Sequence, residues 1–167
     1  MTRLSVLFFV FVFSFCSCSK SDEANISDST TEHINPIDEG ILYSEIADFF
    51  QSNYPPTFEY LAFFGESDKN ECLVINKTED LLSHYSGEKS FPNIDLNKYT
   101  LIVGQEIMTK SLYIIKRQEL LYEGGEYRLN IYVPKLDGGY HMIQHLFYWG
   151  IYPKLNTSKL SVKIIEE

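Results

Sequence analysis

The sequence predicts an α+β domain in which two short helices near the N-terminal side precede an antiparallel β-meander. Three observations predict it. Helical spacing of apolar residues is confined to the part of the domain before residue 86, several later segments have strand length or strict alternation, and glycine-containing turns join them. We expect the strands to form one curved sheet or an open barrel.

The first helix is expected to begin after Asp38, whose side chain can cap the first turn. Pro55 and Pro56 mark its latest end, because proline cannot continue a helix. Residues 57–64 and 71–75 are then expected to form two strands. The apolar residues of the helix recur near helical spacing and are predicted to form its buried face: Ile41, Leu42, Ile46, Phe49 and Phe50.

The second helix is expected over residues 79–85. Asn76 and Glu79 are three residues apart, which is the spacing of a capping box at a helix N-terminus. Leu81 and Leu82 are predicted to point inward. A glycine two residues beyond the helix agrees with its end.

The chain after the second helix has the patterns of β-strands. Residues 99–103 are continuously apolar, which is typical of a strand covered on both faces. A long strand is expected over 112–121, and a Gly-Gly turn joins it to 126–133, where apolar and polar residues alternate. After a second glycine turn, 140–149 and 160–164 are the last expected strands.

The chain begins with a short apolar segment, residues 4–15, after a single arginine. Its length matches the h-region of a signal peptide and falls short of the roughly 20 residues that span a bilayer. The following Phe15-Cys16-Ser17-Cys18 resembles the lipobox of bacterial lipoproteins, with Cys18 as the lipidated residue. The resemblance implies that 1–17 are a signal peptide and that palmitate-type acyl chains anchor the protein. An ordinary cleaved signal with two incidental cysteines is the alternative.

Residues 18–37 are predicted to form a lipidated flexible tether, because their few isolated isoleucines cannot offset the entropy of ordering. Residues 38–167 should then form a single domain. The acidic segment 19–23 resembles the signal that directs some Gram-negative lipoproteins to the cell surface. We therefore expect a lipid-anchored, extracytoplasmic protein of the outer membrane or cell surface. The alternative is that any polar tether contains aspartate and glutamate.

The charge balance argues against a nucleic-acid partner. The chain carries 14 lysine and arginine residues against 23 aspartate and glutamate residues, a formal net charge of −9, whereas phosphate backbones attract basic surfaces. The same charge repels anionic lipid headgroups, so the acyl chains would hold the protein at the membrane. Cys72 would be the lone thiol of the folded part, which is more typical of a small buried hydrophobic residue than of a nucleophile.

The sequence predicts no catalytic residue, no metal site and no cofactor. It contains no His-Glu-x-x-His, Gly-x-Ser-x-Gly or phosphate-binding glycine loop. His141 and His145 are the best metal candidates: on a helix they would lie about 6 Å apart, but on a strand about 13 Å. Their apolar and aromatic neighbours favour a strand, on which the two side chains cannot share an ion.

A second resemblance concerns residues 92–104, Pro-Asn-Ile-Asp-Leu-Asn-Lys-Tyr-Thr-Leu-Ile-Val-Gly. This segment resembles the entry strand of small domains in secreted bacterial lipoproteins, including PrcB-type subunits of surface protease complexes. It covers little more than a dozen residues. The resemblance implies a non-catalytic accessory role and brings no catalytic residue with it.

Aromatic residues crowd the predicted strand that ends near Pro153. Such rings pack in cores, but they also stack on sugars and anchor protein interfaces, so both roles stay open. We expect a non-catalytic accessory lipoprotein that presents a β-sheet face to a protein partner in the envelope. The alternatives are a carbohydrate-binding surface module and a hydrolase whose site is not visible in the sequence. The candidate binding residues are Tyr140, Tyr148, Trp149 and Tyr152.

Overall fold

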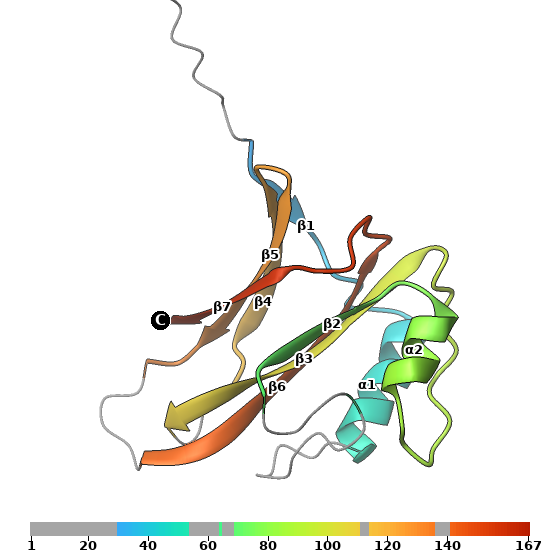
Figure 1. Cartoon of the computed structure of the whole chain (residues 1–167), viewed down its shortest axis with the longest axis horizontal. Coiled ribbons are helices and arrows are strands. Elements are labelled where there is room, and N and C mark those ends of the chain that lie inside the picture. The colour runs from blue at the N-terminus through green and yellow to red at the C-terminus, as the bar shows by residue number, and fades with distance from the viewer. Residues whose placement is uncertain (1–29, 54–63, 65–68, 111–113, 136–140) are drawn as a thin grey trace, which may run out of the picture.

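The computed structural model describes residues 30–53, 64, 69–110, 114–135 and 141–167. Within them the chain forms two helices and seven strands (Figure 1), which confirms the α+β class. In chain order the elements are β1 (Glu32–Ile34), α1 (Ile41–Asn53), β2 (Glu71–Ile75), α2 (Thr78–His84), β3 (Tyr99–Lys110), β4 (Arg117–Glu123), β5 (Glu126–Val133), β6 (His141–Pro153) and β7 (Ser161–Glu166).

The strands form two separate sheets in place of the expected single curved sheet or open barrel. One sheet has the order β2-β3-β6, and both of its pairings are antiparallel. The other has the order β1-β4-β5-β7, in which β5 and β7 are parallel. The parallel pair arises because the chain leaves the β4–β5 hairpin to build β6 in the other sheet and returns as β7 beside β5. The meander therefore does not extend through the last three strands.

The three-stranded sheet is covered on both faces, and β3 shows why. Leu101 and Val103 pack with the helices, whereas Ile102 between them packs with the four-stranded sheet, and all three are fully buried. Successive side chains of a strand point to opposite faces. The continuous apolar segment thus faces two cores, as predicted. Figure 1 shows the helices on one side of β2, β3 and β6 and the four-stranded sheet on the other.

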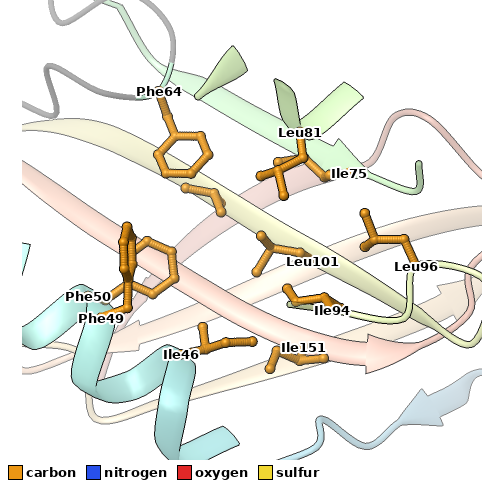
Figure 2. Packing of buried hydrophobic residues seen from close by; sticks show 11 residues of the cluster. Ile46, Phe49, Phe50, Phe64, Ile75, Leu81, Ile94, Leu96, Leu101 and Ile151 are labelled. Atoms are coloured by element: carbon orange, nitrogen blue, oxygen red, sulfur yellow. The ribbon is translucent and has the colours of Figure 1, made fainter. Parts of the chain in front are cut away.

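The helix-side core joins α1 and α2 to the three-stranded sheet (Figure 2). Burial of each large apolar side chain here contributes about 1.5–3 kcal/mol. Partly buried aromatic residues, among them Phe91, Phe147 and Trp149, pack against it. The buried members are Ile46, Phe49, Phe50, Phe64, Ile75, Leu81, Ile94, Leu96, Leu101, Val103 and Ile151.

The sheet-side core fills the space between the two sheets. The alternation predicted for β5 is confirmed, since Leu129, Ile131 and Val133 all point into this core. The preceding turn is also confirmed: Gly124 and Gly125 have φ values of 61° and 89°, which a tight hairpin turn requires and other residues rarely adopt. The remaining buried members are Ile102, Leu120, Leu146, Tyr148, Tyr152 and Leu155.

The start of α2 differs from the predicted capping box. Its N-cap is Lys77, which makes no capping hydrogen bond. The Asn76 side chain instead accepts a hydrogen bond from the Thr100 hydroxyl (2.6 Å) and donates one to the Thr157 carbonyl. Leu81 is buried as predicted, but Leu82 is 72% exposed. The next residue of a helix lies about 100° further round the axis, so α2 buries only one of the two leucines.

The folded part begins earlier than Asp38. Glu32–Ile34, which the composition assigns to the tether, pairs with β4 as β1. The backbone N–H of Ile37 then donates to the carbonyl of Ile151 at 2.7 Å. Backbone pairing needs no apolar run, and Ile34 packs against the sheet-side core. Composition alone therefore misplaces this boundary.

Several sequence predictions concern residues outside the described part. They include the signal peptide, Cys18, the tether up to residue 29 and nearly all of the strand expected over residues 57–64. The turn at residues 137–139 and Tyr140 also lie outside it. Among the residues that the structure describes, no helix combines the length and the apolar character needed to cross a membrane.

Candidate binding surfaces

Tyr148 and Tyr152 are interior residues of β6. Each is only 1% exposed, and both belong to the sheet-side core. The Tyr148 hydroxyl donates to the Glu71 carbonyl at 3.2 Å and contacts the thiol of Cys72. Burial is the main reason why the pKa of Cys72 is raised to about 11, which keeps the thiol protonated at neutral pH. These two tyrosines therefore contribute no exposed ring to a binding face.

Trp149 packs against two aromatic rings of α1. Its ring centroid is 5.0 Å from that of Phe50 in a stacked arrangement and 5.5 Å from that of Tyr43 in a tilted one. Tyr43 and Phe50 are seven residues apart on one face of α1, which separates them by about 10.5 Å along the helix axis. Trp149 therefore contacts α1 at two positions about two helical turns apart.

A groove of about 480 Å³ runs beside Trp149 and Tyr43, with Arg117 and Gln118 of β4 among its lining residues. The Gln118 Nε2 group donates to the Trp149 carbonyl at 3.0 Å. Its Oε1 atom is buried and has no hydrogen-bond partner within the described residues. Trp149 thus lines the groove while its ring also packs on Tyr43 and Phe50.

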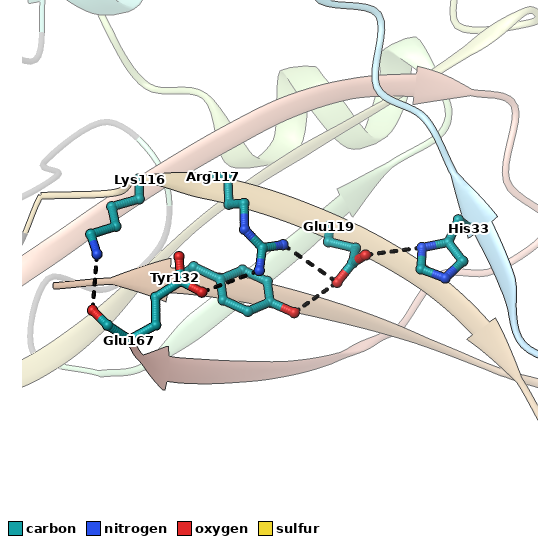
Figure 3. Close-up of polar contacts among 6 residues, drawn as sticks. All are labelled: His33, Lys116, Arg117, Glu119, Tyr132 and Glu167. Carbon is teal, nitrogen blue, oxygen red and sulfur yellow. Dashed lines mark hydrogen bonds and ion pairs between the residues drawn. The ribbon is translucent and has the colours of Figure 1, made fainter. Parts of the chain in front are cut away.

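The outer face of the four-stranded sheet carries a chain of polar contacts that Figure 3 shows. Side chains alternate along strands, so the neighbours of the core residues of β4 and β5 point away from the core. The Tyr132 hydroxyl donates to Glu119 Oε2 at 2.7 Å, and His33 Nδ1 lies 2.9 Å from Glu119 Oε1. Arg117 bridges this carboxylate, at 3.7 Å, and Glu167, at 3.2 Å. We call His33, Arg117, Glu119 and Tyr132 the outer-face network.

The network is held by charge as well as by hydrogen bonds. The Arg117 guanidinium carbon lies 3.2 Å from the Tyr132 ring centroid, which is a cation–π contact. The hydrogen bond from Tyr132 is the largest reason why the pKa of Glu119 is lowered; partial burial opposes it, while the charges of His33 and Arg117 add to it. The carboxylate is therefore ionised at neutral pH. Arginine, tyrosine and carboxylate are thus fixed relative to one another before any partner arrives.

No described helix or strand covers this outer face (Figure 1). Among the residues that the structure describes, no group of three or more His, Cys, Asp and Glu side chains is arranged to hold a metal ion. His141 and His145 both lie in β6, in agreement with the predicted strand. The arrangement offers recognition chemistry, namely a planar cation, an aromatic hydroxyl and paired carboxylates.

The comparisons with known proteins identify no relative, because no family model, no curated protein and no solved structure matches the chain. The functional argument therefore depends on the residues themselves.

The residues of the outer-face network are not among the binding residues predicted from the sequence. A signal was present, because polar residues occupy all but one of the alternate positions of β4 and β5 that face away from Leu120 and Leu129, the exception being the buried Leu121. This pattern marks an outward face but does not show which residues meet. The contact between His33 and Glu119 depends on β1 pairing with β4, and the contact between Arg117 and Tyr132 depends on the β4–β5 register.

Proposed function

We propose that this chain is a non-catalytic, lipid-anchored extracytoplasmic accessory protein that binds a protein partner in the envelope. The binding surface is the outer face of the four-stranded sheet. One observation carries the proposal: the outer-face network places Arg117 against the Tyr132 ring and pairs both with Glu119 on a face that no described element covers.

Arginine and tyrosine are the residue types that most often dominate binding energy at protein interfaces. Ordering a long side chain during association costs about 0.5–1.5 kcal/mol. In this network Arg117 and Tyr132 are already held by each other and by Glu119. Much of the side-chain entropy is therefore lost when the protein folds, and less remains to be lost on binding. Such preorganised charges also favour a partner with a complementary polar surface.

The sequence supports the remaining parts of the proposal. The lipobox-like segment before Cys18 supports an acyl anchor outside the cytoplasm, and the excess of acidic residues disfavours binding of the domain surface to lipid headgroups. The resemblance of residues 92–104 to accessory domains of surface protease complexes points to the same role. The first described strand, β1, belongs to the four-stranded sheet, so the predicted tether precedes in sequence the sheet that carries the proposed binding surface.

The proposal is tested by cross-linking in intact cells, followed by mass spectrometry of the proteins attached to this chain. We expect Tyr132→Ala to reduce the yield of the main cross-linked partner about thirtyfold, since loss of an interface hot spot costs about 2 kcal/mol or more. Leu82→Ala is the control, because Leu82 is exposed on α2, in the helical layer. Equal yields from Tyr132→Ala and the unaltered chain would contradict the proposal, as would the absence of any specific partner.

A further inference from the structure

A second recess lies at the turn end of the β4–β5 hairpin, and His33 is the one member of the outer-face network that also lines it. It has a volume of about 880 Å³, within the range of about 300–1,000 Å³ that is usual for small-molecule sites. Three parts of the chain that are distant in sequence form it: the segment around β1, the hairpin, and the connection from β6 to β7. We call it the hairpin groove, and its lining includes Glu32, Asn35, Tyr122, Tyr127, Asn156 and Lys159.

Two tyrosines form an aromatic wall of the hairpin groove. Tyr122 and Tyr127 are cross-strand neighbours in the β4–β5 register, and their ring centroids lie 4.7 Å apart at an interplanar angle of 44°. Both side chains are half-buried and both line the groove. Tyr127 packs against the sheet-side core, which fixes the pair on the inner face of the hairpin. Tyr132 is on the opposite face, so this wall is distinct from the outer-face network.

Some of the polar side chains around this wall make no contact with the rest of the described protein, whereas His33, Thr157 and Ser161 are engaged. Glu32, Asn35, Glu126 and Asn156 make no side-chain hydrogen bond or ion pair within the described residues. Lys154, in contrast, is occupied, because its ammonium group donates to the carbonyls of Asn76 and Leu96. The groove thus combines amide groups that both donate and accept with carboxylates that accept.

We propose that the hairpin groove binds a neutral oligosaccharide. Tyrosine rings pack against the apolar faces of pyranose units, and the surrounding amides and carboxylates can bond their hydroxyl groups. Among the described lining residues, the uncommitted charged side chains are Glu32, Glu126 and Lys159, which leave a formal charge of about −1. This charge disfavours an anionic ligand and gives a cationic one only a weak attraction. The recognition groups are side chains from three segments and not a row of strand-edge amides, which disfavours an extended peptide.

The test is isothermal titration of the folded domain, residues 30–167, attached to its natural tether, with linear hexasaccharides of glucose, xylose, mannose, galactose and N-acetylglucosamine. We expect at least one to bind and Tyr122→Ala to weaken its affinity about tenfold, from the loss of an aromatic contact of about 1.4 kcal/mol. Asn156→Ala, an exposed loop substitution, should weaken it as well while leaving the melting temperature unchanged.

Tyr132→Ala is the matched control, because it removes a tyrosine from the outer face of the same hairpin. It should leave oligosaccharide affinity unchanged, just as Tyr122→Ala should leave the cross-linked partner unchanged, so that the two proposals succeed or fail separately. Failure of all five hexasaccharides to bind at millimolar concentration would overturn the inference. Binding that survives both Tyr122→Ala and Asn156→Ala, or that is lost in Tyr132→Ala, would also overturn it.

Discussion

Trp149 could pack in a core or contribute to a binding face, and contacts with residues of α1 show that it has the packing role. A tryptophan near the end of a strand suits a core or a binding face. Ring contacts with Tyr43 and Phe50 show that the indole packs on α1. Tyr148, the preceding residue, points to the opposite core. Neighbouring aromatic residues of one strand thus serve two different layers.

We expect Trp149→Ala to lower the free energy of unfolding by about 3 kcal/mol, at the low end of large aromatic truncations because the ring is only half-buried. Equilibrium urea unfolding measures the change. The native emission of this single tryptophan should also be blue-shifted relative to the unfolded chain. Leu82→Ala, at an exposed position, should change the stability by less than about 0.5 kcal/mol. A red-shifted native emission together with an unchanged stability would contradict the packing role.

Glu119 should make the stability of the protein depend on pH. Its pKa is lowered in the folded state, so the ionised carboxylate stabilises the fold above the unfolded-state pKa of about 4.3, and this contribution is lost as the pH falls through the folded-state pKa. Glu119→Gln should therefore be less stable than the unaltered chain by about 1 kcal/mol at pH 7. Urea unfolding at pH 7, 5 and 3 should show this difference shrinking towards zero. A difference of the same size at all three pH values would contradict the assignment.

At the scale of elements, the strands follow from local pattern more closely than the helix ends do. The alternation in β5 and the glycine turn before it specify the β4–β5 hairpin. Asn76 has the spacing of a helix cap, yet its side chain connects the end of β2 to Thr100 of β3 and to the connection after β6. A tertiary hydrogen-bond network here displaces a local capping motif of similar energy.

Gly104 shows how closely β2, β3 and β6 approach one another. A Cβ atom at this position would collide with the Tyr148 ring and with the backbone oxygen of Glu71. We expect Gly104→Ala to lower the free energy of unfolding by about 1–3 kcal/mol, because the backbone of a paired strand cannot easily move aside. Thermal unfolding measures the effect. Thr109→Ala, at an exposed site on the same strand, is the control; similar melting temperatures for the two variants would contradict the close packing.

At the scale of the whole molecule, the domain has three layers: helices, a three-stranded sheet and a four-stranded sheet (Figure 1). The first two bury the helix-side core, and the two sheets bury the sheet-side core. The outer face of the four-stranded sheet is left to the outer-face network. A protein of this architecture can bind a partner on one side without disturbing either core.

The proposed anchor is tested on the whole chain. We expect Cys18→Ala to move the protein from the membrane fraction to the soluble fraction, because the acyl chains on Cys18 would be its anchor and the net negative charge of the chain disfavours binding to anionic lipid. Fractionation followed by a high-salt wash measures the change, with Cys16→Ala as the control that should stay in the membrane. Retention of the Cys18→Ala protein after the wash would contradict lipid anchoring.

The sequence by itself determined the fold class, α1, the β4–β5 hairpin and the double burial of β3, because these depend on periodicity and turn chemistry within short segments. Only the tertiary structure decided that the strands divide into two sheets and that β1 belongs to the domain. The contact of His33 with Glu119 and the packing of Trp149 on two rings of α1 also depend on the tertiary structure alone. The physical reason is that strands pair through backbone N–H and C=O groups, which nearly all residue types share, so the side chains alone do not specify which strands pair. Residues far apart in sequence therefore meet through sheet order, which no local pattern records.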